Sequence, residues 1–531
     1  MAKVKSEIKA LKLFHIYRAM YISFFIAITV TCLISLCVAM LMENYWVLLV
    51  FSALSIFLIF AFCLRLKEFH TYKHLPGPKP SFFLGNLKAL LSQEHTARDQ
   101  ALLNLHQKYG PVVKLHLGWG SVPFVSVCYP SNLVQGNVDS NRQADRTVLG
   151  NSLMGMPSGE KHREHRSKLN PHFTPKAVKL ASPRLLAITS DYLETWKKGK
   201  FRHSNLKSDL HYWSAHTMGI FLASSDWEKE ADLSHYLSSI ATLEDEISFR
   251  AFHPPFVRWI FFLRNSKSRG AYRYLYRFIQ KVFNRRSTRN SKGGVTVEKH
   301  FDVLEMLLHL KHKQEWRESD CIEELISLVA GGTDAVSYTM SQALILLANN
   351  PDVQKKAFDY VKNISISQKD YIHPYIKNII YETMRLYPAV PFSSKRMKQA
   401  SLDQFGVHIP KNTNLMWMKT AIGKNENLFQ APEQFYPERY ETSLNPQKQS
   451  IKSVLPFGAG IRHCIGSHLA EYLCFNFLTD IIKTFELLPI EGLEIDYKAT
   501  VSVSPSLVPV RLVCRSPEVA RSRLLSTSEN L

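Results

Sequence analysis

Two apolar runs near the N-terminus constrain this chain more than any other feature. Residues 20–42 contain no charged side chain, and residues 46–64 are also free of charge. A helix needs about 20 mainly apolar residues to cross a bilayer, so each run has roughly the required length. The sequence therefore predicts an N-terminal membrane anchor over residues 1–69.

Basic residues flank both runs: Lys3, Lys5, Lys9, Lys12 and Arg18 before the first, and Arg65, Lys67 and Lys73 after the second. Lysine and arginine near a spanning helix favour the cytosolic side. Two transmembrane helices forming a hairpin satisfy this rule at both ends, and a single long anchor is the alternative. We expect no cleaved signal peptide, because the apolar stretch is too long and lacks a small-residue cleavage site. A mitochondrial transit peptide suits the basic start but not the long apolar runs.

Composition limits the class of protein and of partner. The 531 residues are 46% hydrophobic and 21% charged, which suits a globular chain with a sizeable core. The formal net charge of +21 indicates an acidic partner, a membrane surface or nucleic acid. Eight cysteines lie far apart along the chain, so no disulfide framework is predicted.

Beyond the anchor, HLPGPKPS at 74–81 predicts a stiff, non-helical hinge. Helical periodicity then dominates the sequence, and no second domain boundary appears. We predict one mainly α domain with small β-sheets over residues 70–531. The clearest helices are expected at 322–348, 353–361, 375–386 and 465–485, and short strands at 112–117, 123–127, 415–418 and 508–513.

The stretch 252–292 joins an apolar segment, FHPPFVRWIFFL, to a strongly basic helical pattern. Leu275, Ile279 and Phe283 recur at helical spacing, so one face of this helix is apolar. Either this segment faces the membrane surface or its basic face is simply solvated. No nucleic-acid-binding motif accompanies the charge, and we expect no nucleic-acid partner.

One cysteine stands in a glycine-rich setting, FGAGIRHCIG at 457–466. A helix predicted to begin just after Cys464 would favour a thiolate there, and the glycines Gly458, Gly460 and Gly466 would let backbone lie against a flat group. Arg462 would meet an anionic group on the edge of that object. A metal macrocycle with carboxylate arms meets these requirements. The alternatives are a buried structural cysteine and a zinc site with His463 and His468, although no fourth zinc ligand lies nearby.

The stretch FGAGIRHCIG resembles the haem-binding signature FxxGxRxCxG of the cytochrome P-450 superfamily. Three further motifs follow that family's pattern and order along the chain: LVAGGTDAVS at 328–337, ExxR at Glu382 to Arg385 leading into LYPAVP, and FYPERY at 435–440. The resemblance covers about residues 70 to 515. It implies the cytochrome P-450 fold behind the anchor, with haem b as cofactor.

Roles carry over residue by residue as implications of this resemblance. Cys464 would be the axial ligand of the haem iron, with Phe457 packed near the sulfur. Glu382, Arg385 and Arg439 would form a buried structural network. The expected contacts of the haem propionates are Arg462, Arg166, and either Lys395 or Arg396, because strand alternation lets only one of the last two face the haem. His162 stands where the family's third helix usually has tryptophan.

The central motif departs from the family at one position. An acid followed by threonine is usual, but here Asp334 is followed by Ala335. Thr333 and Ser337 are the neighbouring hydroxyls, and neither occupies the usual place. The AGG triplet, Ala330 to Gly332, is expected to break this helix, loosen its packing and leave room for oxygen.

Three functions stay open on these residues. The favoured one is a monooxygenase that inserts one oxygen atom from O2 into a lipophilic substrate, with electrons from NADPH through cytochrome P-450 reductase and with cytochrome b5 as a further expected partner. Because Ala335 replaces the usual threonine, an isomerase or dehydratase of lipid peroxides that needs no reductase is the second possibility. A haem binder or sensor without turnover is the third. The anchor predicts the endoplasmic reticulum membrane, with membrane lipid as a partner and the catalytic domain in the cytosol.

Overall fold

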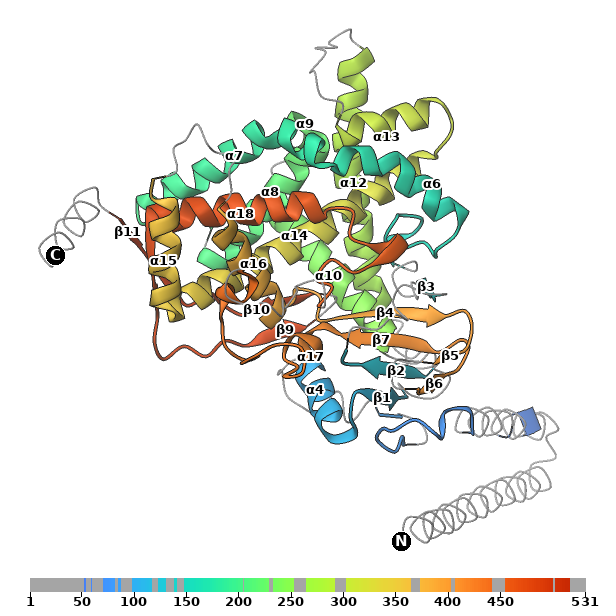
Figure 1. The fold of residues 1–531 in the computed structure, drawn as a ribbon. Coiled ribbons are helices and arrows are strands. Elements are labelled where there is room, and N and C mark those ends of the chain that lie inside the picture. The colour runs from blue at the N-terminus through green and yellow to red at the C-terminus, as the bar shows by residue number, and fades with distance from the viewer. Residues whose placement is uncertain are drawn as a thin grey trace, which may run out of the picture. The chain divides into compact units, whose positions relative to one another are not determined.

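The chain is described by a computed structural model, shown as a ribbon in Figure 1. The structure describes residues 52–53, 59, 70–81, 85–86, 98–116, 123–129, 138–140, 148–203, 205–228, 233–252, 264–291, 302–363, 373–402, 406–441, 454–499 and 502–515. Residues 1–74 and 75–531 form two compact units.

The predicted anchor belongs to the first unit. Both apolar runs lie outside the described residues, apart from positions 52, 53 and 59. In the described part of the chain, none of the helices combines the length and the apolar character needed to span a bilayer. The basic segment after 252 is described from residue 264 onward, where it forms one helix, α12.

Helices make up most of the second unit, and all four helices predicted from periodicity are present. The described helices are α4 (Arg98–Tyr109), α6 (Glu160–Leu169), α7 (Pro175–Lys197), α8 (Leu206–Ala223), α9 (Ser225–Glu228), α10 (Leu233–Phe252), α12 (Arg264–Ser291), α13 (Val303–His312), α14 (Glu318–Asn349), α15 (Pro351–Val361), α16 (Pro374–Leu386), α17 (Lys419–Gly423) and α18 (Ser467–Thr484), with 3-10 turns η2 (Asn170–Phe173), η4 (Pro437–Tyr440) and η6 (Gly460–Arg462).

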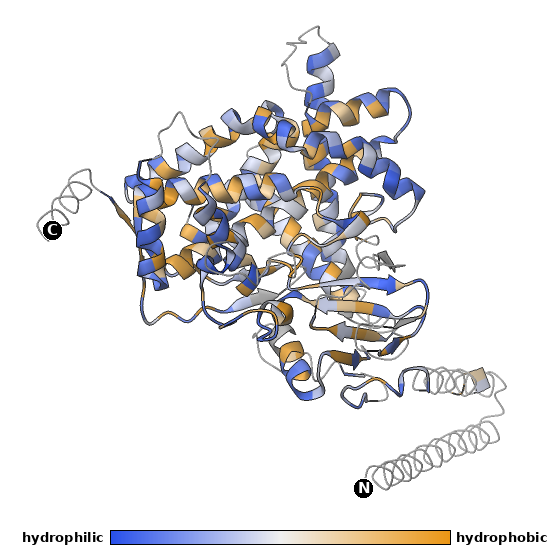
Figure 2. Cartoon of the chain, in the orientation of Figure 1, coloured by the Kyte–Doolittle hydropathy of each residue, from blue (hydrophilic) through white to orange (hydrophobic). Residues whose placement is uncertain are grey.

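Local sequence explains where several helices begin. Thr174 caps α7 by accepting a hydrogen bond from the Ala177 N–H, and Pro175 occupies the first turn, where its missing N–H costs nothing. Asn205 caps α8 and Asp302 caps α13 in the same way. α6 is hydrophilic along most of its length in Figure 2, yet one side of it is buried through His162, His165 and Leu169.

The long helix α14 organises the helical core. It packs against α8, α12, α16 and α18, and most of its residues are buried. The expectation of a loosened helix at the glycines is wrong, because α14 is continuous from Glu318 to Asn349. A Cβ atom at Gly332 would lie 2.5 Å from the side chain of Met218 on α8. Gly332 therefore serves the close approach of two helices.

The strands form a five-stranded sheet and three two-stranded ones, all small as predicted. The large sheet has the order β1-β2-β7-β4-β3 and is antiparallel except between β2 and β7. Helix α4 contributes Ala101 and Leu102 to the apolar layer on this sheet. The strands are β1 (Val112–Leu115), β2 (Phe124–Val127), β3 (Val138–Ser140), β4 (Phe392–Met397), β5 (Ser401–Leu402), β6 (His408–Ile409), β7 (Asn414–Met418), β8 (Phe485–Pro489), β9 (Tyr497–Ala499), β10 (Val503–Pro505) and β11 (Val510–Cys514).

The proline-rich segment runs without helix from Leu75 onward, as its sequence predicts. It lies against β1, because the Lys114 N–H donates to the Pro76 carbonyl at 2.7 Å. A Cβ atom at Gly77 would lie 2.4 Å from the Lys114 carbonyl oxygen, so only glycine fits this approach.

A buried arginine on α12 joins three elements. The Arg286 guanidinium binds the carboxylate of Asp226 on α9, and it binds Asp302 at the start of α13 at 2.8 Å. It also donates to the Ala223 carbonyl at the end of α8. These carboxylates raise the pKa of Arg286 above its ordinary value, although burial alone would lower it. The fold thus depends on this charge being paired.

We predict that Arg286→Ala destabilises the protein by about 3–5 kcal/mol, because buried Asp302 loses its cation and buried Asp226 keeps only the partly exposed Arg289, 3.1 Å away. Urea unfolding followed by circular dichroism measures the loss. Arg273→Ala on the same helix is the control, since Arg273 is exposed and should change stability by no more than about 0.5 kcal/mol. Equal effects of the two substitutions would contradict the structural role of Arg286.

Candidate active site

The cysteine-bearing stretch forms a tight loop before α18. We call residues 454–466 the cysteine loop. Gly458 and Gly460 have φ angles of +72° and +67°, a left-handed backbone that glycine adopts without strain. The Cys464 N–H donates to the Phe457 carbonyl at 2.8 Å, which closes the loop on itself. Gly466 precedes α18 directly, and the Cys464 side chain is exposed.

Three cations from three other elements hold this loop through its backbone carbonyls. Arg166 on α6 donates to His463 at 2.6 Å, and Lys395 on β4 donates to Ala459 at 3.3 Å. Lys419, at the start of α17, donates to Pro456 at 3.1 Å. The loop is therefore fastened at its beginning, its middle and its end by positive charge.

The same surroundings act on the thiol. The protein around Cys464 desolvates it, and this raises its pKa above the ordinary value although its surface is accessible. The Gly466 backbone N–H and the charges of Arg166 and Lys419 oppose that rise. A thiolate is the form of cysteine that binds a metal, so these groups favour the ligating state.

Arg462 points away from the loop's own backbone. Its guanidinium donates to the carbonyls of Leu153 at 2.9 Å and Met156 at 2.5 Å, and to the Ser158 hydroxyl at 3.0 Å. The Leu153 N–H in turn donates to the buried carboxylate of Glu324 on α14. Arg462 thus joins the cysteine loop to the turn before α6, and through it to the central helix.

The two candidate cations on β4 point to opposite faces of the sheet. Lys395 is buried, 7% exposed, and its ammonium group reaches the cysteine loop, whereas Arg396 is exposed. Lys395 also lies 5.4 Å from the centre of the Trp417 ring on β7. Strand alternation produces this difference, since successive side chains point to opposite faces. On α6, His162 is buried one turn before Arg166.

The central-helix residues face α8 and α10. The Asp334 carboxylate lies 2.6 Å from Nε2 of His211 on α8 and also hydrogen-bonds Glu244 on α10. Burial would raise the pKa of Asp334, but these hydrogen bonds and the charges of His211 and Lys207 outweigh it, and the pKa is lowered. Nothing in the sequence singled out His211, because the pairing joins residues 123 positions apart.

The two hydroxyls beside Ala335 bond to the backbone of their own helix. Thr333 donates to the Val329 carbonyl at 2.8 Å, and Ser337 donates to the Asp334 carbonyl at 3.1 Å. Such back-bonding is an ordinary state of a hydroxyl within a helix. Gly331 lies in the interior of α14 and is nevertheless exposed, so α14 borders accessible space at this point.

Glu382, Arg385 and Arg439 form a fully buried ion network. Arg385 on α16 makes a bidentate pair with Glu382, at 2.7 and 2.8 Å, and Arg439 on η4 binds the same carboxylate at 2.8 Å. The other N–H groups of these two arginines donate to backbone carbonyls of residues 423, 430, 431, 432 and 434. One carboxylate thus fastens the segment after α17 to α16.

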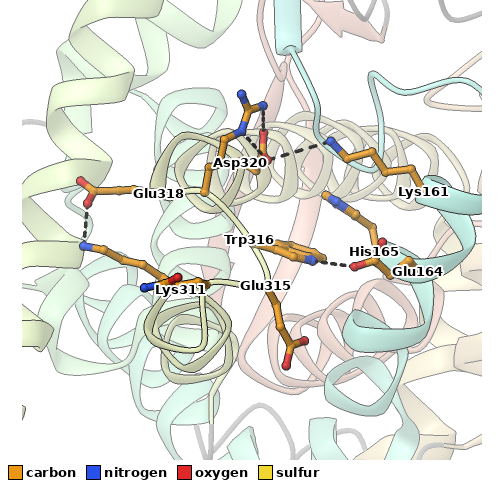
Figure 3. A pocket seen from close by; sticks show the side chains of 10 residues that line it. Lys161, Glu164, His165, Lys311, Glu315, Trp316, Glu318 and Asp320 are labelled. Carbon is orange, nitrogen blue, oxygen red and sulfur yellow. Dashed lines mark hydrogen bonds and ion pairs between the residues drawn. The ribbon is translucent and has the colours of Figure 1, made fainter.

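A separate polar pocket of about 480 Å³ lies beside α6 and the junction of α13 with α14 (Figure 3). Trp316 stacks on His165 at 3.7 Å and donates to Glu164. Charged side chains that line the pocket pair with one another; Lys311 and Glu318, for example, are 2.6 Å apart. His165 contacts the same Glu324 that accepts from the Leu153 N–H, so one wall of this pocket is linked to the segment that Arg462 holds.

The donor set of the cysteine loop fits a haem. It offers one accessible sulfur, a glycine backbone that leaves room beside it, and cations at hand for carboxylate arms. In the described part of the chain, no three His, Cys, Asp or Glu side chains gather as a metal cluster would require. Sequence reasoning missed Lys419, although a lone lysine between the apolar stretches MWM and AIG was a usable signal of a buried charge.

Comparison with known proteins agrees with this geometry. The cytochrome P450 family model matches residues 75–507, and the chain belongs to that family. The predicted resemblance and the mainly helical fold class are thereby confirmed, and haem is the cofactor that the family implies.

Three relatives illustrate the range of similarity. Geraniol 8-hydroxylase of Catharanthus roseus is 28% identical over 81% of this chain and 92% of the relative, and cytochrome P450 3A31 of Mesocricetus auratus is 25% identical over 85% and 92%. Cytochrome P450 81D1 of Arabidopsis thaliana is 32% identical over 42% of this chain. In that alignment the chain spans 44% of the relative.

We predict that Glu382→Ala destabilises the protein by about 3–5 kcal/mol, because two buried guanidinium groups lose their common carboxylate. Chemical unfolding measures the change. Glu433→Ala is a matched control in the same region, since Glu433 forms an exposed pair with Lys424 at 2.9 Å and should cost no more than about 1 kcal/mol. A small effect of the Glu382 substitution would show that the network does not hold the fold.

Proposed function

We propose that this protein is a haem-thiolate monooxygenase that inserts one oxygen atom from O2 into a lipophilic substrate. The observation that carries the proposal is the accessible Cys464 sulfur in a loop held by Arg166, Lys395 and Lys419. Bound haem with an axial thiolate supplies oxygen activation strong enough for unactivated C–H bonds. The relative named geraniol 8-hydroxylase supports a hydroxylation of this kind.

The residues around the loop have separate proposed tasks. Cys464 would hold the haem iron through its sulfur, and Phe457 would pack beside that sulfur. Arg166 and Lys395 already lie at the loop, and Arg462 extends from it, so these three are the proposed partners of the propionates. Gly460 and Gly466 keep backbone close without a side chain. Arg396 is exposed and is the less suitable of the two β4 cations.

Asp334 on the central helix α14 would deliver protons to the site. Asp334 is held ionised by His211 and Lys207, and it can exchange a proton with His211 across the 2.6 Å contact. Ala335 offers no hydroxyl, and the hydroxyls of Thr333 and Ser337 are engaged with the backbone. Water or a substrate group would then complete the path from Asp334.

The same absence of a hydroxyl favours a second candidate, an isomerase or dehydratase of lipid peroxides, which needs neither proton delivery nor a reductase. Consumption of a lipid hydroperoxide without NADPH identifies this activity, whereas turnover that requires NADPH and a reductase identifies the monooxygenase. Haem binding with neither activity would leave the binder or sensor.

Electron supply and location complete the proposal. NADPH-cytochrome P-450 reductase, with cytochrome b5 as a second donor, would approach a basic surface, consistent with the net charge of +21. The apolar runs before residue 65 would anchor the chain in the endoplasmic reticulum membrane, with the catalytic domain in the cytosol.

We predict that the reduced protein with carbon monoxide shows the strongly red-shifted Soret band of thiolate-ligated haem, and that Cys464→Ala abolishes it. The difference spectrum of detergent-solubilised protein is the measurement. Cys514→Ala is the control, because Cys514 is an exposed free cysteine on β11 and should leave the band unchanged. A full band in the Cys464 variant would assign the ligand elsewhere.

We predict that Ala335→Thr raises the share of NADPH electrons recovered in product and lowers hydrogen peroxide release, because a hydroxyl beside Asp334 shortens proton delivery. Peroxide formed per NADPH consumed, with reductase present, is the measurement. Ala335→Val has the same shape without the hydroxyl and should give no gain. Unchanged coupling in the threonine variant would mean that another group already completes the proton path.

A further inference from the structure

Lys419 occupies an unusual place for a lysine. It follows β7, whose five residues are all buried, and it begins the short helix α17. Its side chain is almost wholly buried, with the residue 3% exposed. The backbone N–H donates to the Pro391 carbonyl at 2.8 Å, so the main chain holds the side chain in this position.

Within the part of the chain that the structure describes, no carboxylate pairs with this buried ammonium group. Among the described residues its side chain makes one hydrogen bond, to the Pro456 carbonyl of the cysteine loop at 3.1 Å. Three buried arginines are instead paired with carboxylates: Arg286 with Asp226 and Asp302, and Arg385 and Arg439 with Glu382. A buried charge without a counter-ion is costly, which calls for an explanation.

The negative group that acts on the charge of Lys419 is the thiolate of Cys464. Pro456 precedes Phe457, whose carbonyl accepts the Cys464 N–H at 2.8 Å, so Lys419 binds the loop one residue from the bond that closes it. Burial lowers the pKa of Lys419 to about 8, and the Cys464 thiolate opposes that fall. The loop that Lys419 binds through Pro456 therefore also carries a sulfur whose negative charge would compensate the ammonium group.

We propose that Lys419 is a positioning residue that keeps a fixed positive charge beside the Cys464 thiolate and thereby tunes the electron donation of the sulfur to the haem iron. This inference rests on the proposed function. Lys419 lies outside the sequence motifs described above, and this role explains why a lysine is buried there without a carboxylate partner among the described residues.

The sign of the effect follows from electrostatics. Reduction of the iron by one electron makes the iron–thiolate unit more negative by one charge. A nearby ammonium group stabilises that reduced state, more strongly at a desolvated site than in water. Removal of the charge is therefore expected to shift the reduction potential to a more negative value.

Two substitutions separate the charge from the hydrogen bond. Lys419→Met keeps an apolar side chain of similar length and removes both, whereas Lys419→Gln keeps a donor for Pro456 and removes only the charge. We expect both variants, purified with haem, to have a more negative midpoint potential than the wild type in a spectroelectrochemical titration. Lys419→Arg, which keeps the charge, should stay near the wild type. Lys424→Met is the control directly after the same helix, because Lys424 pairs with the exposed Glu433 and should cause no shift.

Unfolding experiments give a second readout. A Met in place of a buried lysine without a carboxylate should leave the protein at least as stable as the wild type. A shift in the Met variant alone would assign the effect to the Pro456 hydrogen bond and overturn the proposal, as would no shift in either variant. Failure of both variants to fold or retain haem would give Lys419 a purely structural role and also overturn it. A wild type that lacks the thiolate band would instead refute the proposed function, and this inference with it.

Discussion

The structure around the candidate site depends on one kind of interaction, the donation of cationic side chains to backbone carbonyls of the cysteine loop. A loop with two glycines in left-handed conformation has little side-chain packing to keep it in one shape. Arg166, Lys395 and Lys419 supply the missing restraint from three elements. The same charges lie where a thiolate and carboxylates are expected, so the restraint and the chemistry use the same residues.

In the buried ion network around Glu382, by contrast, the charges are paired with one another. Glu382 pairs with two arginines, and nearly every other donor of those arginines reaches a carbonyl, so these charges are satisfied and have no free capacity for a ligand. Their contribution is to hold α16 and η4 together. In contrast, Lys419 is buried without a carboxylate, and this difference distinguishes a group that serves the fold from one that serves the site.

Much of the fold was predictable because its signals are local. Helix periodicity placed α14, α15, α16 and α18, and the Glu382–Arg385 spacing put both side chains on one helical face. The tight packing of α8 on α14 at Gly332 was not predictable, because a glycine in an apolar helix is compatible with a ligand space and with a helix contact alike. Only the partner helix, with Met218, decides between the two.

By itself, the sequence determined the family, the cysteine, the glycines of its loop and the charged pair on α16, since each of these is expressed over a few neighbouring residues. The tertiary structure alone decided that Lys395 and not Arg396 reaches the loop, that His211 binds Asp334, and that Lys419 lies beside Pro456. These contacts join residues 64, 123 and 37 positions apart. No local pattern encodes such pairings, because they arise only when separate elements pack into a common core.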